Sequence, residues 1–142
     1  MTIKLVRSAK IVVLDADNKA LLLRRSHTHP TDAFEPDIPG GTIEHHETIE
    51  EGILRELEEE VGLIITEDDL TLLYTLTFDN IPGVSINRLL YAARLSSQQP
   101  TITLSWEHDE FKWVEISELK GLERPYQKGV DYATTHGLWD SV

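Results

Sequence analysis

The segment from residue 48 to residue 62 carries the strongest structural signal in this chain of 142 residues. Thr48 and Glu51 have the spacing of a capping box, the paired hydrogen bonds that begin many helices. Apolar residues then recur at every fourth position, at Ile49, Ile53, Leu57 and Val61. Gly62 follows them and supplies a helix stop. This pattern predicts an amphipathic helix with one buried face.

Three carboxylates share one patch of this predicted helix. On a helical wheel Glu56, Glu59 and Glu60 fall within about 100° of arc and flank the apolar face. Because like charges repel, a divalent cation such as Mg²⁺ or Mn²⁺ would stabilise this arrangement through the carboxylate oxygens. The alternative is a solvated acidic face in which Arg55 and Glu59 form a simple i,i+4 ion pair. We take the segment as the candidate active site.

The same segment resembles a known family signature. The pattern G-x5-E-x7-R-E-U-x-E-E-x-G-U, with U aliphatic, describes the Nudix hydrolase family, and this chain is similar to it at every fixed position. The matching residues are Gly41, Glu47, Arg55, Glu56, Leu57, Glu59, Glu60, Gly62 and Leu63. The resemblance implies metal-dependent hydrolysis of a nucleoside diphosphate linked to another group, by attack of water on phosphorus.

The resemblance also implies roles for the charged residues of the signature. Glu59 and Glu60 are expected to be metal ligands, and Glu56 a ligand or the general base. Glu47 and Arg55 are expected to brace the loop and to orient the metal ligands. Surface charge is the alternative interpretation of Glu47 and Arg55.

Further metal ligands are expected outside the signature. In the family a backbone carbonyl near Gly40 often contacts the metal. An acidic residue shortly before a Trp-Val pair often completes the metal shell, and here that pair is Trp113 and Val114. Glu107 and Glu110 both fit this position, and the sequence does not choose between them.

Substrate contacts are expected from two arginines and one loop. Arg24 and Arg25 follow the apolar run ALLL. Since neighbours in a strand face opposite sides, one of the two is expected to enter the cleft. Phe78, near the end of a predicted strand, and Asn80, in the turn that follows, combine an aromatic face with hydrogen-bonding groups, so we expect them to contact a base. Surface charge and core packing are the respective alternatives.

Histidines form two short groups in predicted loops. His27 and His29 make an H-x-H pattern, which by itself is weak support for zinc. His45 and His46 precede the signature glutamate, at a place where the family commonly has a glycine. They are interpreted either as loop residues or as an extra contact to metal or phosphate.

Strands alternate with helices along the chain. Strands are predicted over residues 3–14, 20–25, 70–79, 84–95 and 110–116, with a short strand before Pro39 and a last helix over residues 125–135. This order indicates an α/β fold with a mixed sheet between helices. The Nudix resemblance implies an α/β/α sandwich whose loop-helix-loop spans residues 35–63. The length fits a single domain over residues 1–142.

Composition narrows the class of protein. The net charge of −12 argues against nucleic-acid partners, although small nucleotide substrates fit a protein with bound metal. There is no cysteine, no apolar run of membrane-spanning length and no secretory signal pattern, so we expect a cytoplasmic protein without membrane contact. The family resemblance is compatible with a homodimer. A non-catalytic module that senses a nucleotide or sugar nucleotide is the alternative function, but such modules are expected to lose metal-binding glutamates that this chain retains.

Overall fold

The helices and most strands lie where the sequence predicts them. The computed structural model describes residues 2–142. The strands are β1 (Lys4–Leu14), β2 (Ala20–Arg25), β3 (Pro36–Asp37), β4 (Gly40–Thr42), β5 (Thr71–Ile81), β6 (Val84–Arg94) and β7 (His108–Val114). The helices are α1 (Ile49–Val61) and α2 (Arg124–Thr135), with short 3₁₀ helices at Glu67–Asp69, Ile116–Glu118 and Leu138–Ser141.

The strands form one mixed sheet with β1 near its centre. β1 runs parallel to β6 along its whole length, and β6 pairs with β5 as an antiparallel hairpin. On the other side β1 pairs with β4 and with the start of β2, while β3 and β7 pair with β2. Strand β4 was not expected, because its three residues Gly-Gly-Thr show no strand pattern. Its pairing attaches the beginning of the signature segment to the central strand.

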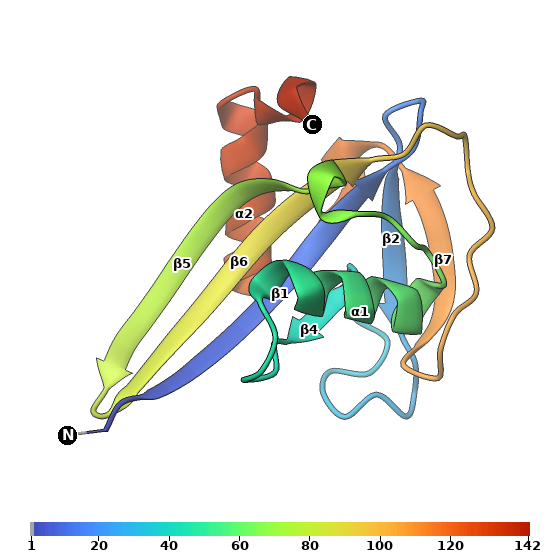
Figure 1. Cartoon of the computed structure of the whole chain (residues 1–142). Helices are drawn as coiled ribbons and strands as arrows, with labels where there is room; N and C mark the ends of the chain where they lie inside the picture. Colours follow the sequence, from blue (N-terminus) through green and yellow to red (C-terminus); the bar gives the residue numbers. More distant parts are fainter. Residues whose placement is uncertain (1) are drawn as a thin grey trace.

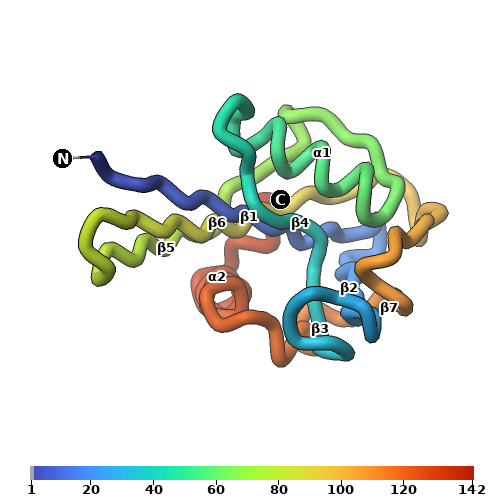
Figure 2. The backbone as a smooth tube through the Cα atoms, turned by 90° about the horizontal axis from the view of Figure 1, so that it is seen from below, coloured from blue at the N-terminus to red at the C-terminus, as the bar shows by residue number. Residues whose placement is uncertain are grey.

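Two hydrophobic cores lie on opposite faces of the sheet. Successive residues of a strand point to opposite sides, so Ile11 and Val13 pack with α1, while Val12 and Leu14 pack with α2. Figure 2 shows α1 and α2 on the two sides of the sheet. The expected α/β/α sandwich is therefore confirmed.

Helix α1 begins and ends at the predicted signals. The backbone N–H of Glu51 donates to Oγ1 of Thr48 at 3.1 Å, and the backbone N–H of Thr48 donates to Oε1 of Glu51 at 2.9 Å. At the other end Gly62 adopts φ 75°, in the left-handed region that glycine enters without strain. Within residues 2–142, neither helix is both long and apolar enough to span a membrane.

The loop predicted between the strands at residues 70–79 and 84–95 is longer than the turn in the structure. Residues 79–81 belong to β5, which continues to Ile81, and Gly83 with φ 76° makes a tighter turn. Irregular pairing between Phe78 and Ile81 accommodates the extra strand length. The β5–β6 hairpin and the beginning of β1 extend well beyond α1, as Figure 1 shows.

Candidate active site

Glu47 and Arg55 connect the loop before α1 to the helix itself. Nη2 of Arg55 donates to Oε1 of Glu47 at 2.6 Å, and Nε donates to Oε2 at 3.1 Å. The Arg55 guanidinium lowers the pKa of Glu47 to about 2. Nη2 of Arg55 also donates to the carbonyl of Thr42 at 3.3 Å, so one side chain joins α1 to both ends of the loop. Such a two-point contact fixes geometry better than a single charge could.

Glu60 is a buried carboxylate at the end of α1. It is 2% exposed, and its Oε2 accepts a hydrogen bond of 2.8 Å from the backbone N–H of Gly40. Burial raises the pKa of Glu60 strongly, the Lys10 charge opposes this, and the charges of Glu56 and Glu107 add to it. The acidic side chains around Glu60 therefore lack enough positive charge to hold all of them ionised.

Glu56 lies one helical turn before Glu60 and faces the same backbone. Burial raises its pKa, while its contact with Nη1 of Arg55 at 3.0 Å lowers it. A Cβ atom at Gly41 would lie 3.2 Å from Oε1 of Glu56, so the backbone of β4 passes directly beside this carboxylate. The two glycines of the Pro-Gly-Gly turn thus allow the loop to approach both helix carboxylates.

A cavity of about 360 Å³ is lined by several of the acidic side chains. Glu56 and Glu60 of α1 line it together with Glu107, which precedes β7, and with the Gly40–Gly41 backbone. Oxygen donors of this kind fit a hard divalent cation such as Mg²⁺ or Mn²⁺. The raised pKa values of Glu56 and Glu60 fit it as well, because a cation would supply the positive charge that the buried carboxylates lack.

Glu107 and Glu110, the two alternatives for an outside ligand, lie in different places. Glu107 lines the cavity, whereas Oε2 of Glu110 is 3.3 Å from Nη1 of Arg24. Arg24 and Glu110 line a separate cavity of about 190 Å³. The alternation along β2 sends Arg25, the neighbour of Arg24, into the larger cavity.

Three other candidates lie outside the larger cavity. The Glu59 side chain is 61% exposed and is 3.4 Å from Nη1 of Arg55. Phe78 and Asn80 lie on the protruding part of β5, and neither lines the cavity. The structure therefore brings Gly40, Glu56, Glu60, Glu107 and Arg25 together around the cavity, and these three do not line it.

Sequence reasoning missed a group of polar residues in the same cavity. Lys10 of β1, Asp37 of β3, Arg88 of β6 and Tyr126 of α2 all line it. One signal was available, since Lys10 directly precedes the apolar run from Ile11 to Leu14. In the structure it is only 8% exposed. A charged residue buried in a strand requires a partner.

Comparison with known proteins agrees with the signature. A family model described as NUDIX domain matches residues 4–134. The chain is 42% identical over 52 residues to the ADP-ribose pyrophosphatase of Methanocaldococcus jannaschii, covering 37% of this chain and 30% of that protein. It is 27% identical over 125 residues to the RNA pyrophosphohydrolase of Acidiphilium cryptum, covering 79% of this chain and 76% of that protein.

A third relative and a solved structure extend this result. The chain is 37% identical over 68 residues to the 8-oxo-dGTP diphosphatase of Proteus vulgaris, covering 48% of this chain and 58% of that protein. The matches with the Methanocaldococcus and Proteus proteins thus span less than two thirds of those relatives. The MutT protein from Methanosarcina mazei Go1 superposes with a TM-score of 0.76 at 21% identity, covering 96% of this chain and 98% of that chain. This likeness shows a shared fold.

Proposed function

The chain belongs to the NUDIX domain family, and from this premise we propose that it is a metal-dependent pyrophosphohydrolase of nucleoside diphosphate derivatives. The relatives that it matches are named ADP-ribose pyrophosphatase, RNA pyrophosphohydrolase and 8-oxo-dGTP diphosphatase. The observation that carries the proposal is the convergence of Glu56, Glu60 and Glu107 on one cavity beside the Gly40–Gly41 backbone. Three carboxylates in one cavity favour a metal-dependent enzyme over a module that only binds nucleotides.

The proposed reaction needs a metal, a water molecule and a base. Mg²⁺ or Mn²⁺ held by the glutamates and by the carbonyl of Gly40 would neutralise the diphosphate and acidify water. Glu56 is proposed as the base that accepts the proton of that water, because it lines the cavity and its carboxylate lies beside the Gly41 backbone. The water oxygen then bonds to phosphorus, the bond from that phosphorus to the bridging oxygen breaks, and the other product leaves with the bridging oxygen.

The surrounding residues hold this arrangement in place. The Gly40 N–H fixes one oxygen of Glu60, which leaves the orientation of the carboxylate defined before a cation arrives. Arg55 contacts both Glu56 and Glu47, so it connects the loop before α1 to the helix. Glu59, on the exposed side of Arg55, is proposed as a ligand to a metal ion at the mouth of the site.

A substrate panel tests the proposal. We expect metal-dependent release of phosphate or pyrophosphate from at least one of nucleoside triphosphates, oxidised nucleotides, ADP-ribose, NADH, dinucleoside polyphosphates and sugar nucleotides. Chelator should abolish the release. Binding of a nucleotide without cleavage of any compound, in Mg²⁺ or Mn²⁺, would refute the enzyme and support the sensing module.

A further inference from the structure

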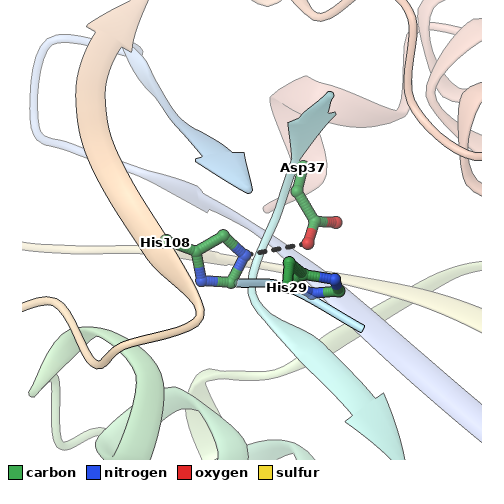
Figure 3. A group of neighbouring side chains, drawn as sticks. All are labelled: His29, Asp37 and His108. Carbon is green, nitrogen blue, oxygen red and sulfur yellow. Dashed lines mark hydrogen bonds and ion pairs between the residues drawn. The ribbon is translucent and has the colours of Figure 1, made fainter. Parts of the chain in front are cut away.

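A buried polar pair joins β3 to β7 next to the cavity. Oδ2 of Asp37 lies 2.9 Å from Nε2 of His108, and the two residues are 4% and 3% exposed. Figure 3 shows the imidazole of His108 directed at this carboxylate. His108 directly follows Glu107, which lines the cavity together with Glu56 and Glu60. The pair therefore fixes the strand position next to a proposed metal ligand.

We propose that Asp37 and His108 are positioning residues for Glu107. Through their contact, the carboxylate of Asp37 determines where the first residue of β7 lies. The backbone that joins His108 to Glu107 then determines where the Glu107 carboxylate meets the metal. This inference rests on the proposed function only in taking Glu107 as a metal ligand.

Asp37 is held through both of its carboxylate oxygens. Oδ1 accepts hydrogen bonds from Nζ of Lys10 at 2.8 Å and from the backbone N–H of Ile38 at 2.9 Å. On the other oxygen, Nε of Arg25 lies 3.3 Å from Oδ2. Burial raises the pKa of Asp37, but the charge of Lys10 and the hydrogen bond from His108 keep this pKa well below its ordinary value. Because an ionised carboxylate only accepts hydrogen bonds, Nε2 of His108 is the donor.

A β-bulge in β7 determines where His108 points. Arg24 of β2 pairs with Glu110, but the next residue, Arg25, pairs with His108, so Asp109 is an extra residue in β7. Bulges of this kind re-aim side chains and are common next to active sites. With regular pairing Asp109 would lie opposite Arg25, and His108 would face the other side of the sheet. The bulge therefore brings His108 to the buried carboxylate.

The main chain around Glu107 is attached to two further elements. The backbone N–H of Ser26 donates to the carbonyl of Glu107 at 2.9 Å, and Oγ of Ser26 donates to the carbonyl of Trp106 at 2.7 Å. The backbone N–H of Ser105 donates to the carbonyl of Glu60 at 3.0 Å, at the end of α1. Within residues 2–142 the Glu107 carboxylate itself makes no hydrogen bond or ion pair. Its position therefore depends on the backbone that these contacts and His108 hold.

His29 raises the alternative of a metal ion at this place. Its ring lies beside the pair in Figure 3, and ligand atoms of His29, Asp37 and His108 lie within 4.8 Å of one another. However, both oxygens of Asp37 already accept hydrogen bonds. A cation there would have to displace the N–H of His108 and approach the charges of Lys10 and Arg25. The geometry therefore favours a positioning contact.

A double-mutant cycle on Mn²⁺ affinity tests the inference. His108→Phe retains a planar ring and removes the donor to Asp37. We expect it to lower the affinity for Mn²⁺ by about tenfold, as loss of contacts around metal ligands does. In a Glu107→Gln background the same substitution should lower the affinity by about twofold or less, because the ligand that His108 positions is already lost. Glu110→Gln is the matched control background, in which the full loss should persist.

Two measurements separate positioning from folding and from substrate binding. His108→Gln should bind Mn²⁺ more tightly than His108→Phe does, because its amide N–H can again donate to Asp37. Chemical denaturation in chelator follows folding, and should His108→Phe fail to fold, His108→Leu replaces it in the cycle. Excess Mn²⁺ should restore kcat of His108→Phe, whereas the loss of a substrate contact would persist.

Three results would overturn the inference. One is an equal loss of Mn²⁺ affinity from His108→Phe in the wild-type and Glu107→Gln backgrounds. Another is unchanged affinity in Glu107→Gln, since Glu107 would then not be a ligand. The third is a loss on His29→Ala as large as that on His108→Phe, which would indicate a metal ion at Asp37. A substrate panel without cleavage, with coupling between His108 and Glu107 intact, would refute the enzyme and leave the positioning role standing.

Discussion

The backbone N–H of Gly40 donates a hydrogen bond of 2.8 Å to Oε2 of Glu60, across twenty positions of sequence. Gly40 adopts φ 134°, and a Cβ atom there would lie 2.2 Å from the carbonyl oxygen of Ala9 and 2.6 Å from Cα of Lys10. Only glycine can therefore bring this N–H so close to β1 and the end of α1. The buried Glu60 obtains a fixed partner, but a neutral one that cannot offset its charge.

Glu60 should make the metal-free protein less stable as pH rises. Because its pKa is raised in the folded state, folded molecules retain a proton that unfolded chains lose above the ordinary value of 4.5. Unfolding is then favoured increasingly as pH rises. We expect the melting temperature in chelator to fall between about pH 5.5 and about pH 8, and the fall to be smaller in Glu60→Gln.

The lowered pKa of Glu47 does not interfere with this measurement. The stabilisation that ionised Glu47 contributes is complete above pH 4.5 and is lost only as the pH falls toward about 2. Glu58→Gln, which alters an exposed glutamate of the same helix, should retain the wild-type slope. Addition of Mg²⁺ should flatten the wild-type profile. An identical pH profile for wild type and Glu60→Gln would show that Glu60 is ionised in the metal-free fold.

Glu59→Gln should reduce turnover while leaving the fold intact. Glutamine keeps the shape of the side chain and removes the charge that a cation requires, so we expect kcat to fall by about 100-fold or more. Glu58→Gln again serves as the control, and circular dichroism checks folding. The Glu59 side chain is largely exposed. Near-normal turnover of Glu59→Gln would contradict its proposed metal role and leave Glu59 as an ion-pair partner of Arg55.

Arg55→Lys should weaken metal binding more than it weakens folding. A lysine ammonium cannot reach both oxygens of Glu47 and the carbonyl of Thr42 as the guanidinium does. We expect the apparent affinity for Mn²⁺, followed by electron paramagnetic resonance of the free ion, to fall by about 10- to 100-fold. Arg124→Lys, an exposed change in α2, should have no effect. Unchanged Mn²⁺ affinity in Arg55→Lys would contradict a bracing role.

Local signals were sufficient to predict the helix and the layers. The capping pair of Thr48 and Glu51 and the stop at Gly62 depend only on neighbouring residues, and the structure has all three. Alternation along β1 likewise determines which residues face each helix. The preference for one of Arg24 and Arg25 followed from the same alternation, and the cavity contains Arg25.

Contacts between residues far apart in the sequence could not be predicted from such local signals. Lys10, Arg88 and Asp37 reach one cavity because β1 pairs with β6 and β2 pairs with β3. No local pattern encodes that pairing. The choice between Glu107 and Glu110 depended on where β7 begins, which strand propensity predicted two residues late. A loop was predicted from residue 79 onward because Asp and Asn are common in turns, although β5 continues to Ile81.

Two glycines inside helices allow a test that separates folding from activity. A Cβ atom at Gly52 in α1 would lie 2.5 Å from Cδ1 of Ile43 and 2.9 Å from Oε1 of Glu47. One at Gly129 in α2 would lie 2.7 Å from Cδ2 of Leu90. Alanine favours helices by about 1 kcal/mol over glycine, but overpacking costs about 1–3 kcal/mol. Both Gly52→Ala and Gly129→Ala should therefore leave the free energy of unfolding unchanged or lower it.

Only Gly52→Ala should also impair the site, because the added methyl displaces the Glu47 carboxylate that Arg55 holds. We expect Mn²⁺ affinity and kcat to fall in Gly52→Ala by about tenfold or more, and to stay near wild type in Gly129→Ala. Chemical denaturation and Mn²⁺ titration of the two variants, side by side, give both quantities. Equal loss of Mn²⁺ affinity in both variants would mean that general destabilisation, and not the position of Glu47, controls the metal site.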